Sequence, residues 1–428
     1  MKITVRRGNQ IGGCITEIES SAGTRIFVDL GHNLPKGNQT SEDEYASEKA
    51  IGDLVGGSRA IFYTHMHGDH VELFQYVPEG IRQYIGPLAH KIMMARYGHM
   101  SHADELKENS LDCLKRLAPF ETYRKGRAIV IDDVVVTPYQ VSHSAADSYM
   151  LKIQCDGYTI LHTGDFRGHG YMGEGIYKVI DKYHIAGNVD VLITEGTNVD
   201  NHGKSMRPES ALKGEFKDVF RQYKNTFVIC SSTDADRLES IYSAGAESTR
   251  RPFMTDTYQK QIIRLIAGQA QDGRRLYHFG PYKIYSYDPD NAKMDYMMRR
   301  YGFVMLIRCS KKFRGYLDRI LPGCNPEETC LVYSQYHGYI DPREGNTAFN
   351  QELYDFVGRF RRLGCRVLER LHTSGHASRQ DLVRLCVQVD PKVIIPIHKD
   401  ENSDFVSILP ADLKARVCED TILLYPRK

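Results

Sequence analysis

Short apolar runs with alternating or β-branched character dominate the first two hundred positions of the chain. Helical periodicity is rarer there, at residues 41–54, 90–97 and 102–117. The expected strands cover residues 3–6, 14–19, 25–28, 60–63, 83–85, 128–131, 134–138, 150–154, 159–161 and 189–194. This part of the chain therefore predicts a sheet-rich α/β domain.

From about Ser205 the pattern changes to amphipathic helices that alternate with buried strands. The expected helices cover residues 208–223, 235–243, 258–267 and 349–361, and the strands cover 226–229, 303–307, 329–333 and 366–368. Such alternation predicts a parallel sheet with crossover helices. After Leu371 a helix at 379–389 and a strand at 392–397 follow.

The length of 428 residues exceeds the roughly 250–300 residues that one core supports. Polar motifs stand on both sides of the alternating segment. We therefore expect a first domain, residues 1–203 and 372–428, that is interrupted by an inserted second domain, residues 204–371.

The charge is divided unevenly along the chain. Residues 203–371 hold 28 Lys and Arg against 20 Asp and Glu, a net charge of +8, whereas the rest of the chain carries −6. A basic segment favours a polyanionic partner. Basic runs at residues 299–300, 311–314 and 361–362 are candidate contacts to a nucleic acid backbone.

Composition excludes several classes of protein. With 41% hydrophobic and 26% charged residues the chain is not expected to be disordered. No apolar run approaches the roughly 20 residues that span a bilayer, and the start MKITVRRG does not read as a signal peptide. We therefore expect a cytosolic protein whose ten scattered cysteines are reduced and mostly buried, rather than metal ligands.

The stretch THMHGDH holds the highest concentration of side chains that can bind a metal ion. It places His65, His67, Asp69 and His70 directly after the apolar run 60–63. If that run continues as a strand, His65, His67 and Asp69 share one face, and a turn at Gly68 brings His70 beside them. The alternative is a solvated turn, but four such groups held together need a cation or a proton. We therefore predict a metal site.

Two further polar residues also follow strands. His143 lies in VSHSAADS, and Asp165 lies in LHTGDF. Each alone is typical of an ordinary loop or turn residue. Because all three segments end strands, they can meet at one edge of a sheet.

These motifs resemble the metal-binding motifs of the metallo-β-lactamase superfamily. The resemblance implies a four-layer αβ/βα sandwich with two zinc ions in a cleft at the sheet edges. Glu195 at the end of the strand 189–194, His376 in HTSGHA and His398 in PIH further resemble the β-CASP nuclease branch, and the chain looks most like ribonuclease J type enzymes.

The resemblance also implies roles for individual residues. One zinc ion takes His65, His67 and His143, the second takes Asp69, His70 and His398, and Asp165 bridges them; Mn²⁺ is an alternative. Asp69, Glu195 and His376 are the catalytic candidates, with Glu195 and His376 protonating the leaving group.

The implied activity is hydrolysis of phosphodiester bonds in single-stranded RNA by a hydroxide held between the two metal ions. Cleavage proceeds from the 5′ end, internally, or both. His398 favours RNA, since DNA-repair members of the branch tend to have valine there. A DNA nuclease, a small-molecule hydrolase and a catalytically inactive binding subunit are the alternatives.

Substrate phosphate contacts are expected at Ser231, Ser232, Ser374, Gly375 and His376, with Arg237 near the first pair. In SSTDADR two acids accompany these serines, so helix capping by Ser232 or Thr233 is an alternative.

Other departures from the family pattern are Gly196 in place of Ser and Lys399-Asp400 in place of Gly-Glu. The chain continues only about thirty residues beyond His398, which leaves no room for the dimerisation domain of longer ribonuclease J proteins, although a homodimer stays open.

Overall fold

The computed structural model describes two compact units. Unit 1 comprises the described residues within 1–34, 42–206 and 375–428. Unit 2 comprises the described residues within 207–374. The described residues are 1–34, 42–103, 106–201, 206–249, 251–270, 276–280, 283–419 and 421–427. The predicted domain boundary at residues 203–204 and the predicted helix start at residue 41 lie outside them, and the domain boundaries stay a prediction.

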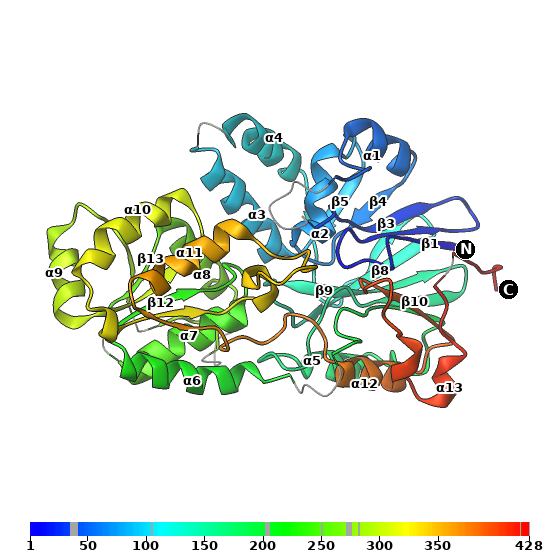
Figure 1. The fold of residues 1–428 in the computed structure, drawn as a ribbon. Coiled ribbons are helices and arrows are strands. Elements are labelled where there is room, and N and C mark those ends of the chain that lie inside the picture. Colours follow the sequence, from blue (N-terminus) through cyan, green and yellow to red (C-terminus); the bar gives the residue numbers. More distant parts are fainter. Residues whose placement is uncertain are drawn as a thin grey trace. The chain divides into compact units, whose positions relative to one another are not determined.

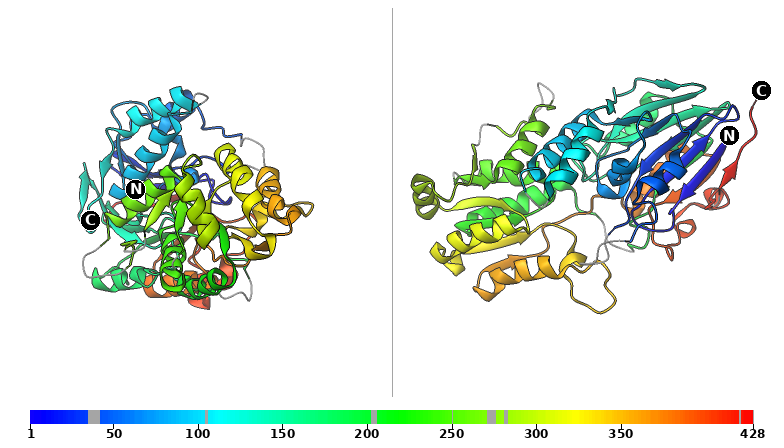
Figure 2. Two further views of the ribbon diagram at one scale, coloured as in Figure 1. Left: turned by 90° about the vertical axis from the view of Figure 1, so that its left-hand side faces the viewer. Right: turned by 90° about the horizontal axis from the view of Figure 1, so that it is seen from above.

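Two sheets form the centre of unit 1. The first has the order β19-β1-β2-β3-β4-β5-β6 and the second has the order β18-β11-β10-β9-β8-β7. The strands of the first sheet are β1 (Lys2–Arg6), β2 (Ile15–Glu19), β3 (Arg25–Leu30), β4 (Ala60–Phe62), β5 (Arg82–Ile85), β6 (Glu121–Thr122) and β19 (Ile422–Leu423). Those of the second are β7 (Ile129–Ile131), β8 (Val134–Val141), β9 (Ser148–Cys155), β10 (Tyr158–His162), β11 (Val191–Glu195) and β18 (Val393–Ile397). β19 pairs antiparallel with β1, so the two marked chain ends lie close together within unit 1 (Figure 2).

Apolar side chains from both sheets share one core. Ile26, Val28 and Phe62 of the first sheet pack with Leu151 and Ile193 of the second. Helices cover the outer faces (Figure 1): α1 (Glu48–Val55), α3 (Pro87–Met100) and α4 (Lys107–Leu117) on one side, and α5 (Gly175–Lys182), α12 (Arg379–Val389) and α13 (Ala411–Lys414) on the other. The order helix, sheet, sheet, helix confirms the predicted αβ/βα four-layer sandwich.

Unit 2 contains a sheet of six parallel strands in the order β14-β13-β15-β12-β16-β17. The strands are β12 (Asn225–Ile229), β13 (Phe253–Thr255), β14 (Ile284–Ser286), β15 (Phe303–Ile307), β16 (Thr329–Tyr333) and β17 (Arg366–Leu368). The helices are α6 (Glu209–Gln222), α7 (Ala235–Ser248), α8 (Thr257–Ala267), α9 (Ala292–Tyr301), α10 (Lys311–Ile320) and α11 (Gln351–Arg362). This parallel arrangement confirms the inserted α/β domain that the alternation predicts.

Several elements were not expected from the sequence. Among them are α5, α9, α10, α13, β6, β13, β14 and β19. In α9 only Met298 is buried, so the helix lacks the apolar stripe that periodicity detects. Strands β13 and β14 have three residues each, too few for a pattern of alternation. Among the described residues, none of the helices is both long and apolar enough to cross a lipid bilayer.

Candidate metal centre

The candidate residues of unit 1 all follow strand ends. His65 to His70 come after β4, His143 after β8, and Asp165 after β10. Glu195 is the last residue of β11, and His398 directly follows β18. Because β10, β11 and β18 run parallel, their carboxyl ends meet at one edge. The fold therefore brings segments more than 300 residues apart in the chain into one cluster.

The predicted alternation within THMHGDH is wrong. Strand β4 ends at Phe62, and Gly68–Val71 forms the short helix α2, so Asp69 and His70 leave from a helical turn. The backbone there bonds to other loops instead of a sheet: Cys14 N donates to Asp69 O at 3.0 Å, and His32 N donates to Gly68 O at 3.0 Å. A Cβ at Gly31 would lie 1.7 Å from Asp69 O, which explains a glycine at that position.

Three imidazoles form the first group of donors. His67 Nδ1 lies 3.2 Å from His65 Nε2 and 3.2 Å from His143 Nε2. Two nitrogens bound to one tetrahedral zinc ion at about 2.0–2.1 Å are separated by about 3.3 Å. The spacing of these nitrogens therefore fits a single shared cation.

A second group joins two imidazoles and two carboxylates. His398 Nε2 lies 3.2 Å from Asp69 Oδ2, and His70 Nε2 lies 3.2 Å from Asp165 Oδ2. Asp165 Oδ2 also lies 3.8 Å from His143 Nε2 and 3.9 Å from His65 Nε2, so it touches both groups. The structure thus brings all seven sequence-predicted ligands together; their individual roles stay predictions.

Buried polar atoms in this cluster lack hydrogen bonds. Within the described part of the chain, both carboxylate oxygens of Asp165 and His70 Nε2 are shielded from solvent and make none. Burial of such groups costs free energy unless a partner compensates them. Imidazole nitrogens and carboxylate oxygens are the donors that Zn²⁺ and Mn²⁺ accept, so the donor set fits a metal centre.

Four neighbouring groups orient the imidazoles; sequence reasoning assigned this role to none of them and named only Gly375, as a substrate contact. Each contacts the ring nitrogen that points away from the cluster, which turns Nε2 toward the other donors. The pairs are Asp29 Oδ2 with His70 Nδ1 at 2.8 Å, Thr64 Oγ1 with His65 Nδ1 at 3.0 Å, Gly375 O with His143 Nδ1 at 2.7 Å and Thr197 Oγ1 with His398 Nδ1 at 2.8 Å. Only Asp29 left a signal in the sequence, as an acid at the end of a predicted strand.

The protonation states of the cluster also suit cation binding. Burial lowers the pKa of His65 and of His143 well below the usual value, and it lowers the pKa of His67 to about 4. Burial acts to raise the pKa of Asp165, but the nearby His398 and His70 hold it well below its usual range. His65, His67 and His143 are therefore in the neutral form that binds metal ions, whereas the charge of Asp165 outweighs burial and raises the pKa of His70 well above its usual value, so metal binding at His70 releases a proton.

One cysteine lies within the cluster. The thiol of Cys14 and the donor atoms of His70 and His398 lie within 4.8 Å of one another. The side chain is buried, as the sequence predicts for the cysteines, whereas Cys309, Cys324 and Cys418 are only half-buried. Burial raises the pKa of the Cys14 thiol well above its usual value.

Glu195 and His376 form a pair beside the donors. Glu195 Oε1 accepts hydrogen bonds from Phe166 N at 2.9 Å and from Ala377 N at 3.2 Å. Its other oxygen, Oε2, lies 3.3 Å from His376 Nδ1, while 22% of the His376 side chain remains exposed. Although burial lowers the pKa of His376, the charges of Glu195 and Asp165 raise it to about 9. The arrangement provides an imidazolium that can donate a proton.

Gly196 and Lys399, two departures from the family pattern, compensate each other in the structure. A Cβ at Gly196 would lie 3.0 Å from Lys399 Cβ and 3.3 Å from the Phe405 ring. Lys399 is buried, and its Nζ lies 3.3 Å from a Glu419 carboxylate oxygen. Glycine at 196 therefore makes room for the long side chain at 399.

In unit 2, Ser231 and Ser232 follow β12 and are half-buried. The capping alternative for Ser232 and Thr233 is wrong, because Asp234 caps α7 by accepting from Arg237 N. Arg237 is buried in an ion pair with Glu209 at 2.8 Å, and its guanidinium also donates to Ser334 O. Arg237 therefore holds unit 2 together, while phosphate binding by Ser231, Ser232 and Ser374 stays a prediction.

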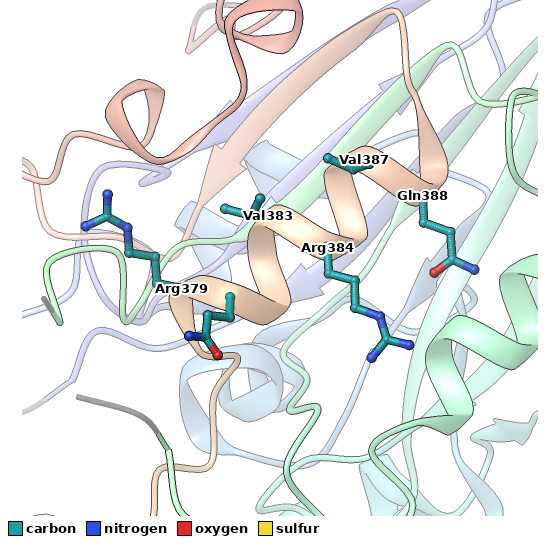
Figure 3. Close-up of a pocket in the computed structure, with 6 residues that line it drawn as sticks. Arg379, Val383, Arg384, Val387 and Gln388 are labelled. Carbon is teal, nitrogen blue, oxygen red and sulfur yellow. The ribbon is translucent and has the colours of Figure 1, made fainter. Parts of the chain in front are cut away.

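Two surface hollows lie outside the cluster. One, of about 740 Å³ on α12, is lined by Arg379, Val383, Arg384 and Val387 among others (Figure 3), and Arg384 is neutralised by Glu174 at 2.7 Å. The other, of about 540 Å³, lies along α10 and is lined by Pro289, Lys311, Lys312, Gly315, Tyr316 and Arg319. We call the second the α10 basic surface, since residues 308–319 hold five Lys or Arg and one Asp.

Comparison with known proteins agrees with this arrangement. Residues 362–403 match the family described as Zn-dependent metallo-hydrolase RNA specificity domain. Ribonuclease J of Helicobacter pylori is 22% identical over 425 residues, covering 94% of this chain and 56% of that protein. Ribonuclease J of Methanocaldococcus jannaschii is 23% identical over 368 residues, covering 83% and 78% respectively. The chain thus spans little more than half the length of the first relatives it matches.

Among solved structures, a protein of unknown function from Enterococcus faecalis superposes with a TM-score of 0.68 at 17% identity. The match covers 94% of this chain and 95% of that one. At this level of identity the likeness concerns the fold alone.

Proposed function

We propose that the chain is a zinc-dependent ribonuclease of the β-CASP branch of the metallo-β-lactamase superfamily; residues 362–403 match a Zn-dependent metallo-hydrolase RNA specificity domain, and the chain is similar to ribonuclease J. It hydrolyses phosphodiester bonds of single-stranded RNA, from the 5′ end, internally, or both. The observation that carries the proposal is one largely buried cluster in which seven candidate ligands adjoin the Glu195–His376 pair.

In this proposal His65, His67 and His143 would hold one ion and Asp69, His70 and His398 the second, with Asp165 beside both donor groups. Bound metal would supply an activated water molecule and would offset negative charge on the phosphate. Asp29, Thr64 and Gly375 keep the imidazoles oriented through their Nδ1 contacts. Zn²⁺ is the expected metal, with Mn²⁺ as the alternative.

The chain's own acid is His376. Glu195 Oε2 faces His376 Nδ1, so the imidazolium keeps that proton and offers the one on Nε2 to the leaving oxygen of the substrate. Glu195 is fixed through its other oxygen by Phe166 N and Ala377 N, so it holds His376 in one orientation.

Substrate phosphates are proposed to bind at Ser231, Ser232, Ser374 and Gly375. The RNA backbone is proposed to bind at the α10 basic surface.

The test is incubation of the zinc-loaded protein with 5′-monophosphorylated, 5′-triphosphorylated and internally structured RNA, together with DNA of matched sequence. We expect RNA to be cleaved faster than DNA, and product lengths separate exonucleolytic from endonucleolytic cleavage. Equal or faster cleavage of DNA would assign the chain to DNA processing instead, and no cleavage of any substrate would refute the proposal. The cytoplasmic location and the homodimer stay predictions.

A further inference from the structure

The hydroxyl of Thr197 stands between the candidate acid and a candidate metal ligand. Thr197 Oγ1 lies 2.8 Å from His398 Nδ1 and 3.2 Å from His376 Nδ1, and it donates to His398 O at 3.2 Å. Thr197 lies two residues after Glu195, at the end of β11. One side chain thus contacts the two histidines that come from different loops of unit 1.

The hydrogen-bonding capacity of a hydroxyl favours one tautomer of His398 and a proton on Nδ1 of His376. A threonine has one proton to donate and two lone pairs to accept with. Since its proton goes to His398 O, the lone pairs are left to accept from Nδ1–H of His398 and from Nδ1–H of His376, which also faces Glu195 Oε2 at 3.3 Å. A neutral His398 that keeps its proton on Nδ1 has a lone pair on Nε2, the atom that lies 3.2 Å from Asp69 Oδ2. A lone pair on Nε2 is what metal binding requires.

The surrounding backbone does not depend on this hydroxyl. Asn198 Nδ2 donates to Ala377 O at 3.0 Å, and Ala377 N donates to Glu195 Oε1 at 3.2 Å. These contacts hold the loop of His376 against the end of β11 by themselves. Removal of the hydroxyl with a residue of the same shape therefore changes ring orientation and tautomer more than it changes the fold.

We propose that Thr197 is a positioning residue, which sets the Nε2 lone pair of His398 for the metal and aligns His376 with Glu195. This inference rests on the proposed metal-dependent function. It predicts that metal affinity and turnover are coupled through one hydroxyl that touches neither substrate nor metal. Loss of an oriented partner of a metal-binding histidine lowers metal affinity or activity by about 10–100-fold.

The experiment compares Thr197→Val with Thr197→Ser in the full chain. Valine keeps the shape of threonine without the hydroxyl, and serine keeps the hydroxyl. The matched control is Thr226→Val, because Thr226 in β12 is buried and its hydroxyl makes no hydrogen bond within the described residues. Three quantities are measured on each: the Nδ1–H and Nε2 signals of His398 by ¹⁵N NMR, zinc affinity by competition with a chelator, and kcat and KM on a single-stranded RNA.

We expect Thr197→Val to lose the single Nδ1–H tautomer of His398, to bind zinc about 10–100-fold more weakly and to lower kcat, with Thr197→Ser and Thr226→Val close to wild type. Unchanged tautomer and zinc affinity in Thr197→Val would overturn the inference, while cleavage by the wild type would still support the proposed function. If the wild type binds zinc but cleaves no RNA, the proposed function fails, and the tautomer and affinity readouts still decide the role of Thr197.

Discussion

Replacement of His376 by alanine should stop proton donation while sparing the metal centre. The charge of Glu195 raises the pKa of His376 to about 9, so the imidazolium form, which holds the proton that a leaving group needs, is favoured at pH 7. Loss of a positioned acid lowers turnover by about 10²–10⁴-fold, equivalent to about 2.7–5.5 kcal/mol of activation free energy. His376→Ala should therefore fall into this range in single-turnover cleavage of RNA.

The variant Glu195→Gln tests whether the Glu195 carboxylate raises the pKa of His376. The Glu195 carboxylate stabilises the protonated form of His376, so its neutral replacement lowers the His376 pKa. Protonated His376 is then lost at lower pH, and the alkaline limb of the rate profile should move to lower pH. The exposed pair His337 and Glu369, whose atoms lie 3.0 Å apart, supplies the controls His337→Ala and Glu369→Gln.

Zinc content and cleavage rate together show whether His376 is a proton donor or a metal ligand. His376 also belongs to a donor group with His143 and Asp165, so zinc content must be measured on the same samples. A wild-type cleavage rate in His376→Ala would remove this residue from catalysis. Loss of zinc in parallel with activity would make it a ligand, and an unshifted pH profile in Glu195→Gln would refute the assigned role of Glu195.

Three further changes test other parts of the account. His67→Ala removes the nitrogen that lies 3.2 Å from both His65 and His143, so it should abolish cleavage and lower bound zinc; cleavage by the purified, metal-stripped variant would contradict this. Gly196→Ser should destabilise unit 1 by about 1–3 kcal/mol in urea unfolding through its contact with Lys399, and Gly196→Ser with Lys399→Gly should recover part of that loss; strict additivity would refute the compensation. Lys311→Glu with Lys312→Glu should weaken RNA binding and reduce the salt slope by about 1.4, whereas Lys49→Glu on α1 should not; an equal effect of both would mean general charge attraction only.

The four-layer arrangement was predicted from the resemblance to a known family, whereas the regular apolar runs predicted the individual strands. Strands such as Val191–Glu195 and Phe303–Ile307 are fully buried, and their β-branched and apolar composition predicted the second with its observed bounds and the first as residues 189–194. Helices α5 and α10, with eight and ten residues, were not predicted, although the equally short α1 was expected within residues 41–54. The order of the strands in the sheets depends on contacts between distant segments, and local periodicity carries no information about such contacts.

The candidate ligands were predictable because they sit in compact motifs, whereas their supporting partners were not. His65 to His70 form one motif, and a resemblance to a family extended it to Asp165 and His398. Thr197 and Asp29 contact those histidines only once β3, β11 and β18 are placed in the fold. The strand alternation proposed for His65, His67 and Asp69 failed because the hydrogen bonds of the α2 backbone go to Cys14 and His32.

The central claim is that two metal ions act together in RNA cleavage. It is tested most directly by adding zinc stepwise to the metal-stripped protein and measuring the initial rate of RNA cleavage against bound zinc. We predict little activity up to one equivalent and a plateau at two, because the two donor groups share Asp165. A plateau at one equivalent, or cleavage that does not depend on zinc, would contradict the account.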